Sequence, residues 1–224
     1  MHVLIEENTS GRDFVVGDIH GHFDLLNEEL SYAGFNPQND RLFSVGDLID
    51  RGPESLQCLE LLNQSWFYAV RGNHEQMMID FVLHNAFPNW RRDYGQWLDN
   101  ISDEEARIWA ARLGELPIAM TLQCTDYKVG ICHAEPAGLD WDKMINDPDS
   151  SKQMMWGRTV LRGEGDLALL RGIDFTVHGH TPVAQPRRIG NRYFLDTGAG
   201  SGDRLTLMRL DKLFQEYSDY KVFL

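Results

Sequence analysis

The amino-acid sequence predicts an α/β fold, and we expect one domain to span residues 1–224. The first third alternates short apolar strands with amphipathic helices, a rhythm that is typical of parallel strand pairing. The later part changes to short β-rich runs separated by turns, which indicates a second sheet packed against the first. No internal repeat, low-complexity run or long linker interrupts the chain, so a single domain is the simplest interpretation.

The elements of the first third follow from hydrophobic periodicity and turn residues. We expect three strands, at 14–16, 42–45 and 67–70, each with apolar residues and a glycine close after its end. A helix is expected over 23–33, where apolar residues recur at roughly helical spacing. Pro53 suits the first turn of the next helix, because the N–H group it lacks would have no helical partner there.

The middle of the chain is predicted to be helical and the remainder β-rich. One helix is expected over 75–84, and a capping box at 102–105 begins another that runs toward Leu113. The tail, 213–224, alternates weakly and predicts a strand. The other expected strands are short and lie at 118–124, 128–132, 175–178, 193–195 and 205–210.

Composition argues against several classes of protein. The net charge of −13 disfavours a nucleic-acid partner, because such proteins usually carry a basic face. No run of about 18 apolar residues predicts a membrane span, and the first residues lack the pattern of a secretory signal. Cys58, Cys124 and Cys132 have no CxxC or zinc-finger spacing, which suits a reducing compartment. We therefore expect a cytoplasmic protein that binds neither nucleic acid nor membrane.

The three strands of the first third end in the same kind of sequence, a glycine followed by polar residues. These motifs cover residues 17–21, 46–52 and 72–75. In α/β sheets the carboxyl ends of neighbouring strands open on one crevice. The glycines let the backbone turn tightly and leave room for a ligand. The motifs would bring together two aspartates, a histidine and an asparagine: Asp18, His20, Asp47 and Asn73.

Two histidine motifs in the β-rich half extend this set. His133 directly follows the strand at 128–132, and His180 lies in the Gly-His-Thr-Pro motif at 179–182. The combined carboxylate, imidazole and amide groups include no thiolate, which suits Mn²⁺, Fe or Zn²⁺ in a reactive site. Asp47 can bridge two ions through its two oxygens. Two ions about 3.5–4 Å apart would activate a water molecule and hold the reacting phosphate oxygens.

Each of these residues has a more ordinary interpretation. A lone aspartate after a strand is usually a cap or a turn former, and a lone histidine is more often a packed or surface residue than a ligand. Five motifs that all follow apolar strands argue against that interpretation for the set. His178, two residues before His180, is expected to have a structural role instead.

Three arginines give a second signal for phosphate. Arg51 and Arg71 lie within or beside the strand-end motifs, and Arg158 follows a Trp-Gly pair. A guanidinium group offers forked donors that match phosphate oxygens. A solvated surface position is the default for an arginine, but Arg51 lies between two metal motifs and is the strongest candidate.

The motifs together resemble a known family. Gly-Asp-Ile-His-Gly (17–21), Gly-Asp-Leu-Ile-Asp-Arg-Gly (46–52) and Arg-Gly-Asn-His-Glu (71–75) resemble the signature of the phosphoprotein phosphatases within the calcineurin-like metallophosphoesterases. Cys-His-Ala (132–134) and Gly-His-Thr-Pro (179–182) are similar to its small lambda-type phage and bacterial branch of serine/threonine protein phosphatases. The resemblance implies a four-layer sandwich in which helices flank two mixed β-sheets.

The resemblance also implies the ligands of two divalent ions, which are typically Mn²⁺ in this branch. One ion would be bound by Asp18, His20 and Asp47. The other would share Asp47 and be bound by three further residues: Asn73, His133 and His180. The expected reaction is direct attack by a hydroxide that bridges the ions. Cys58 and Cys132 lie inside apolar runs, which argues against a cysteine nucleophile.

Four catalytic residues are implied as well. His74, paired with Asp50, would protonate the leaving group. Arg51 and Arg158 would hold the phosphate, with Arg71 assisting in substrate binding. The substrates would be phosphorylated proteins, through phosphoserine and phosphothreonine and, with dual specificity, through phosphotyrosine.

Two alternatives compete with this function. The first is a hydrolase of dinucleoside polyphosphates or other small phosphoesters from the same superfamily. The nucleotide-cleaving relatives have alanine before the arginine of the second motif and Gly-Asn-His-Asp in the third, whereas this chain has Asp50 and Glu75 there. The second is a metal-free scaffold for protein binding, which should have lost ligands, and none is missing here. The segment at 134–151 matches no motif of the family.

Overall fold

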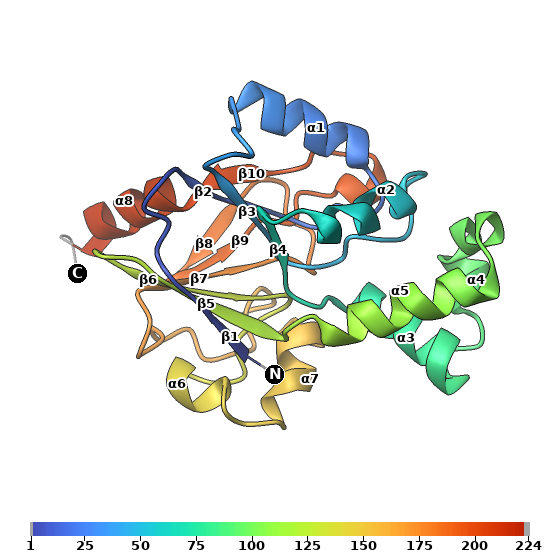
Figure 1. The fold of residues 1–224 in the computed structure, drawn as a ribbon. Helices are drawn as coiled ribbons and strands as arrows, with labels where there is room; N and C mark the ends of the chain where they lie inside the picture. The colour runs from blue at the N-terminus through green and yellow to red at the C-terminus, as the bar shows by residue number, and fades with distance from the viewer. Residues whose placement is uncertain (1, 222–224) are drawn as a thin grey trace.

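The computed structural model describes residues 2–221, and two β-sheets lie face to face at its centre (Figure 1). The smaller sheet has the strand order β10-β2-β3-β4. Its strands are β2 (Asp13–Val16), β3 (Arg41–Ser44), β4 (Phe67–Ala69) and β10 (Leu207–Arg209). β2, β3 and β4 pair in parallel as predicted, whereas β10 is antiparallel to β2.

The larger sheet has six strands in the order β1-β5-β6-β7-β9-β8. They are β1 (His2–Ile5), β5 (Ala119–Gln123), β6 (Lys128–Cys132), β7 (Phe175–His178), β8 (Arg187–Ile189) and β9 (Arg192–Phe194). β6, β7 and β9 run in parallel, and β5 is antiparallel to β6. Both sheets are therefore mixed, and the carboxyl ends of β6 and β7 provide further attachment points for polar side chains.

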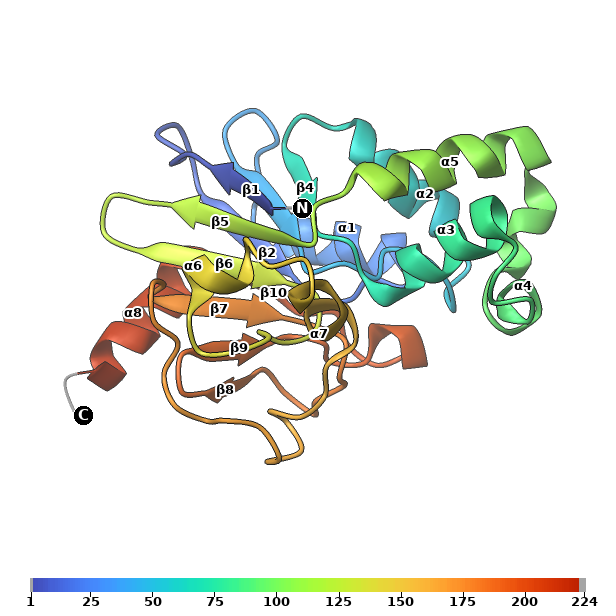
Figure 2. The ribbon, with the colours of Figure 1, turned by 90° about the horizontal axis from the view of Figure 1, so that it is seen from below.

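Helices cover the outer face of each sheet. Those on the smaller sheet are α1 (Phe23–Tyr32) and α2 (Ser55–Glu60). Helices α3 (Asn73–His84) and α5 (Asp103–Glu115) pack on each other and project beyond the sheets (Figure 1). The short helix α4 (Trp90–Asp93) and the 3-10 turn Gln96–Asn100 connect α3 to α5. The larger sheet is covered by α6 (Trp141–Met144) and α7 (Ser150–Trp156), which Figure 2 shows over its outer face.

Apolar side chains point alternately to the two faces of the sheet, because successive residues of a strand face opposite sides. In β2, Val15 faces the larger sheet, whereas Phe14 and Val16 face the helices on the other side. Val15 packs in one cluster with residues of the larger sheet such as Ile131 and Val177. The predicted four-layer sandwich of two mixed sheets flanked by helices is thus confirmed.

The predicted strand over the tail is wrong for the part of it that the structure describes. Residues up to Lys221 form helix α8 (Leu210–Lys221), and 222–224 lie outside the described residues. Leu210, Leu213 and Tyr217 are buried at helical spacing in the cluster between the sheets. Packing of this apolar stripe decides the conformation, because a weak alternation of apolar residues carries little local preference.

Other boundaries differ by small amounts. Helix α2 begins at Ser55, so Pro53 precedes the helix instead of lying in its first turn. Strand β1 pairs in parallel with β5 although no strand is expected there from the sequence. None of the helices among residues 2–221 has the length and apolar character needed to cross a membrane.

Candidate metal centre

The polar motifs lie where strands of both sheets end. Asp18 and Asp47 lie in the loops just beyond β2 and β3, and Asn73 is the first residue of α3. His133 directly follows β6, and His180 lies just beyond β7. The side chains expected to bind metal are all buried, with exposed fractions of 6% or less: Asp18, His20, Asp47, Asn73, His133 and His180.

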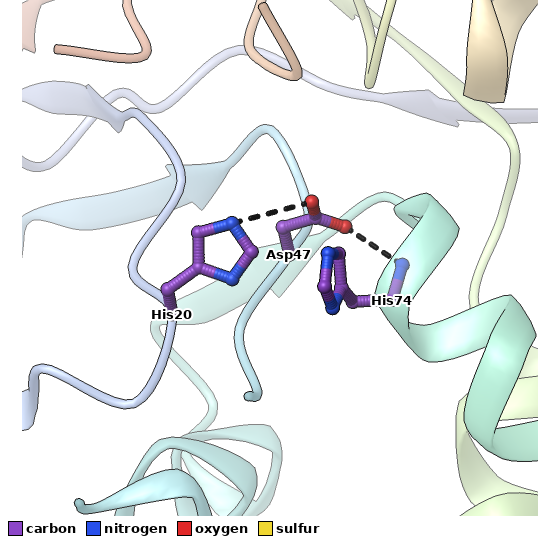
Figure 3. Close-up of side chains that lie close together, drawn as sticks. All are labelled: His20, Asp47 and His74. Carbon is purple, nitrogen blue, oxygen red and sulfur yellow. Dashed lines mark hydrogen bonds and ion pairs between the residues drawn. The ribbon is translucent and has the colours of Figure 1, made fainter. Parts of the chain in front are cut away.

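Asp47 lies between two groups of nitrogen atoms. Its Oδ2 is 3.5 Å from His20 Nε2, and its Oδ1 is 3.3 Å from His133 Nε2. Asp47 Oδ1 also accepts the backbone N–H of His74 at 3.0 Å. Figure 3 shows the Asp47 carboxylate between His20 and His74. The two oxygens of the Asp47 carboxylate therefore face different histidines, Oδ2 toward His20 and Oδ1 toward His133.

Asn73 and Asp18 complete the cluster. Asn73 Oδ1 is 2.9 Å from His133 Nε2 and 2.7 Å from His180 Nδ1. The backbone N–H of His180 lies 3.1 and 3.0 Å from the two carboxylate oxygens of Asp18. The structure thus brings together all six residues that the sequence motifs indicated.

Two groups of ligand atoms are close enough to hold a metal ion. One comprises His20, Asp47 and His74, and the other comprises Asp47, His133 and His180, with the atoms of each within 4.8 Å of one another. Asp47 belongs to both. The first group contains His74 where the family resemblance assigns Asp18, but His74 Nδ1 is 2.6 Å from Asp50 Oδ2. One of the two ring nitrogens is therefore already engaged with a carboxylate.

The electrostatics of the cluster favour bound cations. Burial and the nearby Asp196 carboxylate raise the pKa of Asp18 well above its ordinary value. Although burial opposes the shift, the charge of Asp47 raises the pKa of His133 to about 10. No salt bridge in the described chain joins Asp18 to a lysine or an arginine. Buried carboxylates need a paired charge or a coordinated cation, so this donor set fits two divalent ions.

Backbone contacts fix the two aspartates. Glu75 is fully buried and accepts the backbone N–H groups of Asp47 and Gly72, each at 2.8 Å. Any Cβ atom on Gly72 would collide with Asp47 Oδ1, and one on Gly179 would collide with Asp18 Oδ1. These two glycines are therefore required by close approach of the backbone to the carboxylates.

His74 and Asp50 form a buried pair beside the cluster. His74 Nδ1 lies 2.6 Å from Asp50 Oδ2, while its Nε2 lies 3.4 Å from a guanidinium nitrogen of Arg51. Although burial opposes the shift, the charge of Asp47 and the hydrogen bond to Asp50 raise the pKa of His74. Asp50 thus holds the Nδ1 edge of the ring, and Nε2 lies beside Arg51.

The three arginines are placed differently. Arg51 contacts His74, and Arg158 Nε donates to His180 Nε2 at 3.1 Å, so both lie at the cluster. Arg71 donates to Gln76 Oε1 at 3.0 Å and to the carbonyl oxygens of Gly114 and Leu116. The structure does not bring Arg71 together with the other two, because these contacts turn its guanidinium group toward the end of α5.

Sequence reasoning missed two buried carboxylates near the site. Asp196 follows strand β9, and Glu135 lies within the segment at 134–151 that matched no motif. Glu135 accepts the backbone N–H groups of Thr159 and Val160, each at 2.8 Å, and so fixes the chain directly after Arg158. The strand-end pattern could have identified Asp196, whereas Glu135 has no local signature.

His178 has the structural environment expected from the sequence. The residue is fully buried, and its two ring nitrogens lie 3.1 Å from the carbonyl oxygen of Cys132 and 2.7 Å from Thr176 Oγ1. Both ring nitrogens are thus engaged within the larger sheet.

The sandwich and the shared-carboxylate site define a metallophosphoesterase. Residues 14–184 match the family described as calcineurin-like phosphoesterase, and the chain belongs to this family. It is 39% identical to serine/threonine-protein phosphatase 1 of Salmonella typhimurium over 88% of this chain and 91% of that protein. It is 30% identical to the asymmetrical bis(5'-nucleosyl)-tetraphosphatase PrpE of Anoxybacillus flavithermus over 89% and 90% of the two chains.

A solved structure shows the same fold. A crystal structure described as that of a diadenosine tetraphosphatase superposes with a TM-score of 0.68 at 22% identity, covering 94% of each chain. At that identity the likeness concerns the arrangement of sheets and helices alone.

Proposed function

We propose that this chain is a protein phosphatase that hydrolyses phosphoserine and phosphothreonine in cytoplasmic proteins, using two Mn²⁺ ions. The observation that carries this proposal is Asp47, whose carboxylate belongs to both potential metal groups and lies beside the His74–Asp50 pair. The likeness to a bacterial serine/threonine-protein phosphatase over most of both chains supports it.

Six residues would hold the metal ions. Asp18, His20 and Asp47 would bind one ion, and Asp47 would be shared with the other. The second ion would also be bound by Asn73, His133 and His180. Two divalent ions supply a water molecule whose pKa is lowered toward neutrality and neutralise charge on the phosphate oxygens.

The remaining side chains act on the substrate. Arg51 and Arg158 flank the cluster and would orient the phosphate oxygens through forked N–H donors. His74 would donate a proton to the departing oxygen, while Asp50 holds Nδ1 and fixes the orientation of the ring. Arg71 is engaged with carbonyl oxygens near α5, so we assign it no phosphate contact.

Hydrolysis of a dinucleoside polyphosphate is the competing function, because PrpE is also a relative. The higher identity to the serine/threonine-protein phosphatase, 39% against 30% for PrpE over similar shares of the chain, favours the protein phosphatase. Asp50 and Glu75 are fully buried and hydrogen bonded around the site, Asp50 to His74 and Glu75 to the Asp47 loop.

A substrate panel tests the proposal. The purified protein with Mn²⁺ would be assayed on phosphoserine and phosphothreonine peptides, a phosphotyrosine peptide, a diadenosine polyphosphate and an aryl phosphate. We expect the highest kcat/KM on the phosphoserine or phosphothreonine peptides, and loss of all activity in Asp47→Asn. A diadenosine polyphosphate that is cleaved with higher kcat/KM than every peptide would assign the competing function instead.

A further inference from the structure

Asp50 is surrounded by more hydrogen-bond donors than a simple partner of His74 requires. Its side chain is fully buried, and Oδ2 accepts from Trp90 Nε1 at 2.9 Å in addition to the contact with His74 Nδ1. Oδ1 accepts from Trp97 Nε1 at 2.8 Å. Its backbone N–H donates to Ser55 Oγ at 2.9 Å. Both carboxylate oxygens thus have defined partners.

The two indole donors come from one segment that is separate from the strand-end motifs. Trp90 begins α4 and Trp97 lies in the 3-10 turn Gln96–Asn100, in the connection between α3 and α5. Figures 1 and 2 show this connection at the far end of the α3–α5 pair. The indoles therefore reach back from a helical extension toward the metal centre.

Packing holds the indole rings in place. Trp90 and Trp97 meet edge to face with ring centroids 6.5 Å apart, and Phe81 packs on Trp90 at 5.5 Å. A Cβ atom on Gly95 would lie 2.6 Å from Trp90 Cζ3, so the chain passes directly against the ring. Both tryptophans are buried. Their N–H groups are consequently fixed in direction.

The chemistry of these donors matters for the carboxylate. An indole N–H donates a hydrogen bond and carries no formal charge. An arginine or lysine in the same place would neutralise Asp50 and compete with His74 for it. Among the described residues His74 is the one ion-pair partner of Asp50. Two neutral donors orient the carboxylate and leave its charge to act on the imidazole.

We propose that Trp90 and Trp97 are positioning residues that orient Asp50 and, through it, the His74 ring for protonation of the leaving group. This proposal rests on the role given to His74 in the proposed function. It makes the α3–α5 connection part of the catalytic apparatus, although the segment contributes no metal ligand. The two indoles donate to Asp50 and would act through it.

Trp97→Phe and Trp90→Phe test the proposal, because phenylalanine keeps an aromatic ring and removes the N–H donor. Each variant should lower kcat for alkyl phosphate substrates by about 10- to 100-fold, the effect of losing one hydrogen bond to a charged group. The loss on aryl phosphates should be distinctly smaller, since an aryl oxide needs less protonation. Bound metal should not change.

Trp141→Phe is the matched control. Trp141 is fully buried and its Nε1 donates to Thr121 Oγ1 at 2.8 Å, in the larger sheet. The same chemical change there should leave the ratio of alkyl to aryl turnover unaltered. A folding defect in one tryptophan variant, detected by thermal unfolding, leaves the other variant as the test.

A double-mutant comparison separates this proposal from the function it rests on. In a His74→Asn background, Trp97→Phe should cause no further loss on alkyl phosphates. If His74→Asn discriminates between leaving groups but the tryptophan variants do not, the positioning role is wrong. The same holds if Trp97→Phe causes its full loss in the His74→Asn background. If His74→Asn itself affects both substrate classes equally, the proton-donor role of His74 fails first.

Discussion

At the scale of single residues, the site depends on backbone conformations that L-amino acids rarely adopt. Five residues around the cluster have φ angles between 48° and 77°: His20, Asp47, Asp50, Arg51 and His180. Each such conformation costs of order 1–3 kcal/mol and persists only where the surroundings enforce it. Strained backbone conformations of this kind cluster at active sites. The backbone and the side chains therefore indicate the same functional site.

The role of His74 gives the sharpest prediction at this scale. His74→Asn should lower kcat for phosphoserine peptides by about 10²–10⁴-fold, the usual contribution of general acid catalysis. Aryl phosphates should lose distinctly less, because the negative charge of an aryl oxide is delocalised. Kinetics on a series of leaving groups, with metal content measured in parallel, check this. Equal losses on all substrates, or a loss of metal, would show that His74 has another role.

Asp40 allows a prediction about stability. This buried carboxylate accepts two backbone N–H groups and pairs with Arg12. Although burial opposes the shift, the hydrogen bonds from Arg12 lower the pKa of Asp40. A lowered pKa means stabilisation that is present above the unfolded pKa of about 4 and is lost as the pH falls through the folded value.

Asp40→Asn should therefore lower the free energy of unfolding by about 1–3 kcal/mol near neutral pH. The difference from wild type should shrink as the pH falls below about 4. Urea unfolding at several pH values measures it. Asp99→Asn, in the exposed pair with Arg91, is the control and should change stability by at most about 1 kcal/mol. A pH-independent Asp40→Asn effect would contradict this account.

At the scale of the elements, strand-end motifs could be predicted because their signal is local. Asp18, Asp47 and Asn73 each follow an apolar strand and a glycine, and the parallel pairing of β2, β3 and β4 carries them to one edge. The histidines after β6 and β7 reach the same place because the second sheet packs on the first. The side chains of both sheets therefore converge as the motifs indicated.

Other features could not be predicted because they depend on tertiary contacts. Helix α8 forms because Leu213 and Tyr217 pack between the sheets, which the weakly alternating tail does not reveal. The contacts of Asp50 with Trp90 and Trp97 join residues far apart in sequence and leave no spacing to recognise. The contacts of Arg71 could not be predicted either, because its partners lie far away in sequence, at the end of α5.

The loop that carries Arg158 gives a prediction at this scale. Glu135→Gln replaces an acceptor of two backbone N–H groups with an amide that can accept through one oxygen only. We expect kcat/KM for phosphopeptides to fall by about 10-fold or more. Metal content should stay the same. Glu164→Gln, at an exposed position in the same loop, is the matched control and should leave kcat/KM unaltered. A Glu135→Gln variant with wild-type kinetics would contradict the positioning of Arg158 by Glu135.

At the scale of the whole molecule, an acidic chain with a net charge of −13 must act on an anionic substrate. In the proposed function, divalent ions held by the clustered carboxylates and histidines would supply positive charge where strands of both sheets end. Cys58 and Cys132 are buried, and burial raises the pKa of each thiol far above its ordinary value. Neither cysteine is therefore suited to act as a nucleophile.

The proposed function predicts direct attack by water. Hydrolysis of a substrate with a chiral phosphorus centre should proceed with inversion, because a single displacement occurs. Stereochemical analysis of the released phosphate checks the outcome. Net retention, or a phosphorylated side chain trapped during turnover, would indicate a two-step reaction through a phosphoenzyme.

The most direct test of the two-metal account is the number of metal ions bound per chain. Elemental analysis of protein reconstituted with Mn²⁺ should approach two ions per chain, with activity following occupancy. Asp47→Asn should weaken both sites together, because Asp47 is the carboxylate that the two groups share. Full activity with a single saturable ion, or an Asp47→Asn variant that still binds two ions with wild-type affinity, would contradict the account.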